Sequence, residues 1–357
     1  MKIGDICAYA PKSQIKAGEA IDGAEYMFFT SSPDENKRYS EYQIDGEGII
    51  MGTGGNATLH YYSGKFATST DCIVLLPRNT LRCKYLYYYL KANMNILEAG
   101  FKGAGLKHTN KKYIGNIEIN KIPDCTKQDE IILILDKLEK IIDSRNKELT
   151  LYDDLIKARF VEMFGDARKN PNKYDTVSFI DIVEYMGDIG SNGANKVVVD
   201  HLDMKDKEDY AMMVRFTNFT KNDFTDDVKY VSKEAYDFFK KSQIFGGELI
   251  ICKIGSAGQN YVMPYLNRPV SLGLNQIMVR IKDKILMPYL YQYLHTDYGE
   301  FLISGCTNGA VTKTITKTEL KKIPVMLPPM ELQREFVAFV EQVDKSKSND
   351  LSFVEFQ

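Results

Sequence analysis

Short apolar runs followed by glycine-containing loops occur at matching places in the two halves of the chain. The first half carries GEGIIMGTGGN at 46–56, and the second carries GGELIICKIGSAGQN at 246–260. Apolar runs bounded by turn residues predict buried β-strands, and the glycines predict a tight, exposed turn after each strand. Each half also opens with a short strand-like or helical lead, at 2–9 and at 179–186. This recurrence indicates an internal repeat.

The order of signals stays the same beyond the glycine loops. Each half is predicted to continue with a strand, a Tyr/Leu-rich helix, a basic Gly/Thr loop and a closing apolar strand with a proline before a helix start. In the first half these segments lie at 66–76, 84–97, 100–114 and 117–131, and in the second half at 270–281, 288–303, 304–320 and 323–336. The tyrosines between 85 and 89 share helical spacing with leucines, which favours packing on their own domain over base stacking.

A long segment without glycine or proline joins the two halves, from Gln128 to about Met163. At about 1.5 Å per residue, its roughly 36 residues would form a helical rod of about 54 Å. A second amphipathic helix is predicted to begin near Met330 and to end within KSKSND at 345–350, at about half that length. The residues expected to pack against partner helices are Leu135, Leu138, Ile142, Leu149, Tyr152, Ile156, Met163, Leu332, Phe336, Phe339, Val340 and Val343.

Together these patterns predict an α/β (α+β) protein with an internal pseudo-repeat. Two domains of mixed β-sheet and helices are expected at 1–125 and 167–329. They would be separated by long helices capable of forming a coiled coil, a central one at 126–166 and a short distal one at 330–357. Gly165 and the Lys-Asn-Pro-Asn stretch at 169–172 indicate the end of the central helix and a linker.

Composition limits the class of protein. A hydrophobic content of 44% and a charged content of 26% are typical of a folded globular protein. No stretch approaches the roughly 20 apolar residues of a membrane span, and the N-terminus lacks the apolar core of a signal peptide. We therefore expect a cytoplasmic protein without a membrane partner. The net charge of −2 indicates that any nucleic-acid surface must be local or completed by a partner.

Motifs that would indicate catalysis are not recognisable in the sequence. It contains no phosphate-binding G-x-x-x-x-G-K-[ST] loop and no Asn/Asp-Pro-Pro-Tyr of the kind that amino-methyltransferases use. The four histidines have no partner at metal-ligand spacing, and the six cysteines form no C-x-x-C pair. We therefore predict no catalytic residue, no metal site and no cofactor bound by this chain.

Two segments resemble the specificity subunit (HsdS) family of type I restriction–modification systems. IPVMLPPMELQREFVAFVEQVDKSK at 323–347 is similar to the entry into that family's distal helix, and LIKARFVEMFGD at 155–166 is similar to the exit from its central helix. The resemblance covers essentially the whole chain. It implies two target-recognition domains that each read half of a split double-stranded DNA target, held on helices that dock two modification (methyltransferase) subunits. Restriction (motor–nuclease) subunits would join the complex, and S-adenosylmethionine would be bound by the methyltransferase partner.

Candidate DNA contacts lie in the duplicated loops. Backbone N–H groups of glycine loops can approach phosphates, lysines can anchor them, and Asn, Gln or Thr side chains can read base edges. A simple turn between strands and a solvated charged face are the structural alternatives. In the first half the candidates are Thr53, Gly54, Gly55, Asn56, Thr70, Lys102, Lys107, His108, Thr109 and Lys111. In the second half they are Lys253, Ser256, Gln259, Asn260, Asn275, Gln276, Asn308, Lys313 and Thr314.

Two other functions remain open at this point. The predicted distal helix is shorter than is usual in the family, which would suit a regulatory or decoy homologue that binds a methyltransferase without a productive complex. A stand-alone DNA-modifying enzyme with an unfamiliar catalytic motif is the other alternative.

Overall fold

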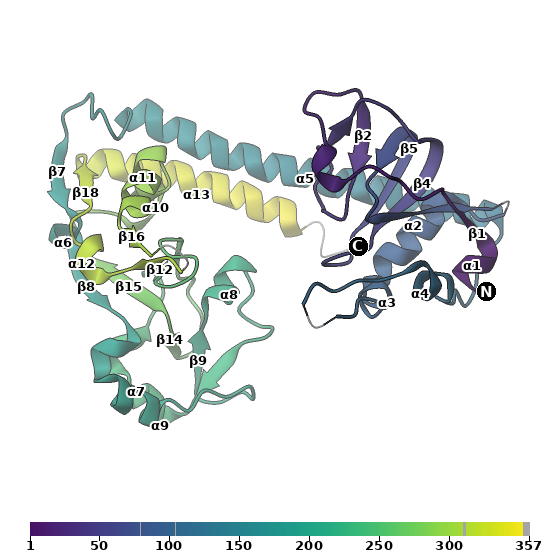
Figure 1. Cartoon of the computed structure of the whole chain (residues 1–357). Coiled ribbons are helices and arrows are strands. Elements are labelled where there is room, and N and C mark those ends of the chain that lie inside the picture. Colours follow the sequence, from purple (N-terminus) through teal and green to yellow (C-terminus); the bar gives the residue numbers. More distant parts are fainter. Residues whose placement is uncertain (79, 104, 310–311, 353–357) are drawn as a thin grey trace. The chain divides into compact units, whose positions relative to one another are not determined.

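The computed structural model describes every residue except 79, 104, 310–311 and 353–357. For residues 348–352 it describes the backbone but not the side chains. The chain divides into two compact units, Met1–Asn146 (unit 1) and Lys147–Gln357 (unit 2). The boundary lies inside the long helix α5 (Cys125–Phe164). Each unit has its own β-sheet structure and its own core (Figure 1).

Unit 1 is built on a six-stranded sheet with the strand order β1-β6-β4-β5-β2-β3. Its strands are β1 (Cys7–Tyr9), β2 (Tyr26–Phe29), β3 (Arg38–Tyr39), β4 (Ile44–Gly52), β5 (Leu59–Thr68) and β6 (Cys72–Pro77). Neighbours pair antiparallel except β2 and β5, which are parallel. Because successive residues of a strand point to opposite faces, Ile49 and Met51 of β4 enter one core while Ile50 enters another.

Short helices complete unit 1. They are α1 (Ile3–Ile6), α2 (Cys83–Ala92), α3 (Met94–Glu98) and α4 (Lys111–Gly115), with a 3-10 turn at Ala17–Glu19. Buried residues of α1, α2, α3 and α4 pack with those of β4 and β6 in one core. The loop that carries the candidate lysines, between α3 and α4, is thereby anchored at both ends.

Unit 2 contains two four-stranded sheets, ordered β10-β9-β14-β11 and β13-β12-β15-β8, and two strand pairs, β16-β17 and β18-β7. Its strands are β7 (Asp175–Ser178), β8 (Val183–Gly187), β9 (Ala211–Val214), β10 (Lys229–Val231), β11 (Gln243–Ile244), β12 (Leu249–Cys252), β13 (Asn260–Val262), β14 (Val270–Leu272), β15 (Gln276–Ile281), β16 (Thr307–Asn308), β17 (Thr314–Ile315) and β18 (Pro324–Leu327). Its helices are α6 (Phe179–Ile182), α7 (Asn195–His201), α8 (Phe216–Thr220), α9 (Lys233–Phe238), α10 (Met287–Leu294), α11 (Asp297–Gly305), α12 (Lys317–Leu320) and α13 (Met330–Ser352), with 3-10 turns at Ile189–Asn192 and Lys240–Ser242.

The predicted order of the repeat is confirmed. One helical turn followed by a strand, α1–β1 in unit 1 and α6–β8 in unit 2, comes before the glycine loops, which follow β4 and β12. Two predictions are wrong in detail. Each Tyr/Leu-rich helix is broken into two, α2–α3 and α10–α11. The closing strand forms in unit 2, as β18, but the corresponding segment of unit 1 forms only an isolated bridge, between Glu118 and Lys2.

Helices α5 and α13 run antiparallel where both belong to unit 2. Arg159 of α5 pairs with Glu335 of α13 at 3.0 Å, and Lys347 of α13 pairs with Asp153 of α5 at 2.8 Å. The 40 residues of α5 correspond to about 60 Å of helix. The prediction that the distal helix ends within 345–350 is wrong, since α13 has 23 residues and continues to Ser352.

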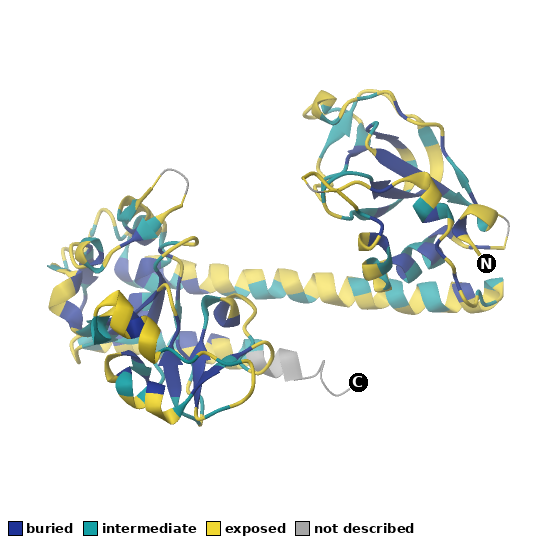
Figure 2. Cartoon of the chain, turned by 60° about the horizontal axis from the view of Figure 1, so that its bottom comes forward, coloured by how far each residue is buried: buried dark blue, intermediate teal, exposed yellow. Residues whose placement is uncertain are grey.

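The predicted seam residues divide into two groups. Those on α13 and on the C-terminal part of α5 belong to the main core of unit 2: Tyr152, Ile156, Met163, Leu332, Phe336, Phe339, Val340 and Val343. Elsewhere on α5, Leu135 and Leu149 are half-buried. Leu138 and Ile142 are 48% and 58% exposed, so they do not pack against another helix in the described part of the chain. Figure 2 shows exposed and intermediate residues alternating along the middle of α5.

Candidate nucleic-acid interface

In unit 1, the glycine loop and the lysine-bearing loop are paired through their backbones. The N–H of Gly55 donates to the carbonyl of Lys107 at 2.9 Å, and the N–H of Thr109 donates to the carbonyl of Thr53 at 3.0 Å. An antiparallel bridge joins Gly54 to His108 between these bonds. Two segments that are about 50 residues apart in sequence therefore form one surface, as the repeated motifs suggest.

Unit 2 repeats this pairing at equivalent positions. The N–H of Gly255 donates to the carbonyl of Lys313 at 3.1 Å, and the N–H of Ile315 donates to the carbonyl of Lys253 at 3.0 Å. The bridge between them joins Ile254 to Thr314. Because each of these bonds joins backbone atoms, the same pairing can form in both units although their side chains differ.

A third segment completes each framework from the strand that follows. The N–H of Thr53 donates to the carbonyl of Asp71 at 2.8 Å, and the N–H of Lys253 donates to the carbonyl of Asn275 at 2.7 Å. Asn275 has a φ of +60°, a left-handed conformation that asparagine tolerates better than most residues. This conformation, together with its exposure, leaves the Asn275 side chain available at the surface.

The candidate residues differ in how far they reach the surface. Those that are exposed are Asn56, Lys102, Lys107, His108, Lys111, Ser256, Gln259, Asn275, Asn308 and Lys313. Partly buried positions are Thr53, Gly54, Gly55, Thr70, Lys253 and Thr314. Thr109, Asn260 and Gln276 are 8%, 5% and 1% exposed, so none of them projects from the outer surface of its unit.

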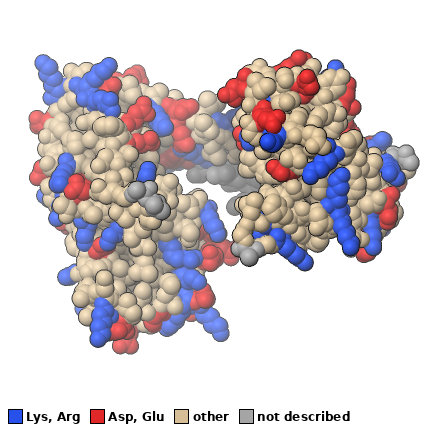
Figure 3. Space-filling model, viewed as in Figure 1, with Lys and Arg blue, Asp and Glu red and all other residues tan. Residues whose placement is uncertain are grey.

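Uncompensated lysines lie on these loops. Within the described part of the chain, no ion pair involves Lys102, Lys107, Lys111 or Lys313. Lys111 instead lies 5.2 Å from the centre of the Tyr9 ring. Figure 3 shows Lys and Arg side chains on the side of unit 1 that carries α3 and α4. Cations without an internal partner are the groups that phosphates attract most strongly.

Lys253 differs from the other candidate lysines because it forms an ion pair inside unit 2. Its ammonium group donates to Asp188 Oδ2 at 2.9 Å, and Lys317 donates to Asp188 Oδ1 at 2.8 Å. The Asp188 side chain is only 9% exposed. Burial alone would raise the pKa of Asp188, but hydrogen bonds from Lys317, Lys253 and Ser191 hold that pKa well below its usual range. Asp188 therefore tethers the glycine loop to α12, a role with no local signal in the sequence.

Two buried glutamines occupy equivalent positions where a long helix meets its unit. The side chain of Gln128 accepts from the N–H of Arg82 and donates to the carbonyls of Thr80 and Pro123, each at 2.8 Å. The side chain of Gln333 accepts from the N–H of Leu286 at 2.9 Å and donates to the carbonyl of Pro328 at 2.9 Å. Both are completely buried. They fasten the start of α2 to α5 and the start of α10 to α13.

The contact of α2 with α5 in unit 1 is polar. The Tyr88 hydroxyl donates to Asp136 at 2.6 Å and to Glu139 at 2.8 Å, while Lys84 and Lys91 pair with the same two carboxylates. Burial and these carboxylates raise the pKa of Tyr88 far above its usual value. In unit 2, by contrast, α10 meets α5 and α13 through the aromatic residues Phe160, Phe336 and Tyr289.

Among the described residues there is no group of three or more His, Cys, Asp or Glu side chains that could hold a metal ion. In the same part of the chain, no helix combines the length and the apolar character needed to cross a bilayer.

Comparisons with known proteins agree with this architecture. The family model of the type I restriction modification DNA specificity domain matches residues 1–151 and 181–352. The EcoDI specificity subunit of Escherichia coli is 21% identical, over 92% of this chain and 78% of that protein. The MjaVIII specificity subunit of Methanocaldococcus jannaschii is 20% identical, over 83% of this chain and 72% of that protein. The S subunit of the M. genitalium type I restriction–modification system has the same fold, with a TM-score of 0.56 at 15% identity, covering 99% of this chain and 91% of that one.

The chain therefore belongs to the type I restriction–modification DNA specificity family. Its function is that of the DNA specificity subunit of such a system, a class of subunit that recognises DNA and does not itself catalyse a reaction. The duplicated loop framework is the structural counterpart of the two matched segments.

Proposed function

We propose that each unit reads one half of a split double-stranded DNA target through its paired glycine and lysine loops. The observation that carries the proposal is the identical backbone pairing of these loops in both units. Exposed lysines such as Lys107 and Lys313 would anchor phosphates, and exposed amides such as Asn56 and Asn275 would face base edges. Two recognition surfaces on one chain suit a target of two parts.

Modification (methyltransferase) subunits are the partners that the long helices would dock. Leu138 and Ile142 on α5 remain exposed at 48% and 58%, and an apolar stripe of this kind typically binds another amphipathic helix. We propose two such subunits, with S-adenosylmethionine bound in them and with restriction (motor–nuclease) subunits joining the complex. The specificity chain would itself hold no cofactor.

Reconstitution with the modification subunits tests this function. The full chain, the modification subunits and S-adenosylmethionine should methylate DNA at two half-sites separated by a spacer of fixed length, and omission of the chain should abolish that pattern. Absence of methylation by the complete mixture would favour the regulatory or decoy homologue. Methylation by the chain alone would instead identify a stand-alone enzyme.

Lysine variants test the interface itself. Lys107→Gln and Lys313→Gln should each weaken DNA binding and reduce the slope of log K against log salt by about one, because each lysine would neutralise about one phosphate. Lys196→Gln, at an exposed position on α7, is the matched control. If the control changes the slope as much as the loop variants do, the loops are not the DNA contact.

A further inference from the structure

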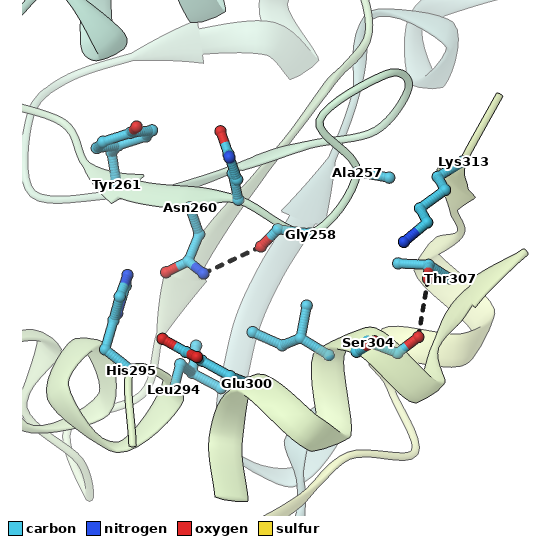
Figure 4. Close-up of a pocket in the computed structure, with 12 residues that line it drawn as sticks. Ala257, Gly258, Asn260, Tyr261, Leu294, His295, Glu300, Ser304, Thr307 and Lys313 are labelled. Atoms are coloured by element: carbon cyan, nitrogen blue, oxygen red, sulfur yellow. Dashed lines mark hydrogen bonds between the residues drawn. The ribbon is translucent and has the colours of Figure 1, made fainter. Parts of the chain in front are cut away.

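A pocket of about 380 Å³ in unit 2 lies beside the paired loops. Its wall is formed by the end of the glycine loop, the start of β13, and the helices α10 and α11. Figure 4 shows the polar ends of Asn260, His295 and Glu300 gathered at one end of this pocket, with the Lys313 side chain at the other. Polar groups converging in a partly apolar pocket are typical of a binding site for a small molecule or a nucleotide.

Asn260 supplies a buried acceptor without a partner. Its Nδ2 donates to the carbonyl of Gly258 at 3.1 Å, and this bond fixes the orientation of the amide because a carbonyl can only accept. Its Oδ1 is buried and has no donor within the described part of the chain. The whole residue is 5% exposed. A buried oxygen in this situation is costly unless a bound group donates to it.

His295 and Glu300 add two more acceptors at the same end. His295 Nδ1 lies 2.8 Å from the carbonyl of Tyr291, to which it must donate. Burial lowers the pKa of His295, so the ring is neutral near pH 7 and its Nε2 carries a lone pair. Glu300, on α11, also lines the pocket; it is exposed and has no ion pair among the described residues. This end of the pocket therefore offers three acceptors, of which the buried Asn260 Oδ1 most needs a donor, and it suits a ligand group with N–H donors.

The rest of the pocket narrows the ligand class. Leu294 and Ile303 give it an apolar wall suited to a flat ring. The ammonium group of Lys313, at the opposite end, suits an anionic group such as a phosphate. A ligand with an amino group at one end, a planar ring and a phosphate at the other satisfies all three features.

We propose that this pocket binds a nucleotide whose base carries an exocyclic amino group, cytosine or adenine. The nucleotide is either free or an unpaired base of bound DNA, and the second source rests on the proposed function of unit 2. The site is particular to unit 2. By strand register Asn260 pairs with Ile251, and the equivalent residue of unit 1, opposite Met51, is Leu59, which offers no acceptor.

Titration of the full chain with CMP and UMP tests the proposal, because these nucleotides differ at the amino group. CMP should bind roughly tenfold to a hundredfold more tightly than UMP, since UMP places a carbonyl against acceptors. Glu300→Gln should abolish this preference, because an amide can donate to the uracil carbonyl. Asp297→Asn, on the same helix, should preserve it. Equal affinity for CMP and UMP, or a preference that survives Glu300→Gln, would overturn the assignment.

Duplexes with one unpaired cytosine or one unpaired thymine distinguish the two sources. A preference for the unpaired cytosine, lost in Glu300→Gln, identifies a base of bound DNA as the ligand. A preference seen with CMP alone identifies the free nucleotide. No preference with either kind of probe refutes the pocket, while methylation directed by the same preparation in the reconstituted complex would show that the proposed function still holds.

Discussion

Removing the charge of Asp188 should loosen the loop framework of unit 2. Asp188 accepts from Lys317 and Lys253 at 2.8 and 2.9 Å, and from Ser191 at 2.8 Å. A hydrogen bond to a charged group contributes about 1.5 to 3 kcal/mol. Asn at this position keeps one acceptor oxygen, and both lysines are about one-third exposed and can turn to solvent. We therefore expect Asp188→Asn to lower the free energy of unfolding of unit 2 by about 2 kcal/mol, roughly 30-fold in the unfolding equilibrium.

The pH dependence separates this cause from a general packing defect. The folded pKa of Asp188 is depressed, so its stabilisation is present above the unfolded value of about 3.9 and is lost as the pH falls through the folded pKa. The difference between the wild-type chain and Asp188→Asn should therefore be constant between about pH 5 and 8 and should shrink below about pH 4.

Urea unfolding followed by circular dichroism measures the effect, since the chain contains no tryptophan for fluorescence. Asp200→Asn, an exposed carboxylate of α7 in the same unit, is the control and should leave the midpoint unchanged. A loss of stability in Asp188→Asn that is as large at pH 3 as at pH 7 would refute the electrostatic tether. An unchanged midpoint at pH 7 would refute it as well.

Three further predictions concern the long helices. Tyr88→Phe removes a hydroxyl that donates to two carboxylates of α5, and it should lower the free energy of unfolding of unit 1 by about 1 to 2 kcal/mol. The control Tyr89→Phe should change this free energy little, and equal effects of the two variants would contradict the assignment. Gln333→Leu leaves the buried N–H of Leu286 and carbonyl of Pro328 without these hydrogen bonds, and it should lower the free energy of unfolding by about 2 to 3 kcal/mol. An unchanged midpoint in urea would argue against this role of Gln333. Four residues inserted after Ser144 lengthen α5 by about 6 Å. Methylated-site mapping should then show a spacer changed by about two base pairs, and an unchanged spacer would exclude a ruler role for α5.

The sequence predicted the repeat and the two loops because both leave local signals. Glycines after an apolar run and lysines among Gly and Thr are visible in a single stretch of chain, and their duplication at 46–56 and 246–260 fixed the correspondence. The long helix could be predicted for the same reason, since the absence of glycine and proline from Gln128 to Met163 is a property of one segment.

Tertiary contacts explain what the sequence did not show. Gln276 has an amide side chain of the type that can read base edges, but its strand β15 is central in its sheet and its side chain is buried. Lys253 has the position of a phosphate contact, but it also pairs with Asp188, which lies 65 residues earlier and shares its carboxylate with Lys317. The continuation of α13 through polar residues to Ser352 was missed because the apolar periodicity ends earlier, while its ion pair from Lys347 to α5 helps to keep it helical.

The division between backbone and side chains in the two loop frameworks bears on what the protein can recognise. Pairing of Gly55 with Lys107, and of Gly255 with Lys313, uses only backbone N–H and carbonyl groups. Except at Gly55 and Gly255, whose φ values of +83° and +87° favour glycine, side chains in these loops can therefore change without altering the pairing. They do differ between the units: Ser256 in unit 2 corresponds to Asn56 in unit 1, and both are exposed. Because a constant framework presents different side chains, we expect the two half-sites of the DNA target to differ in sequence.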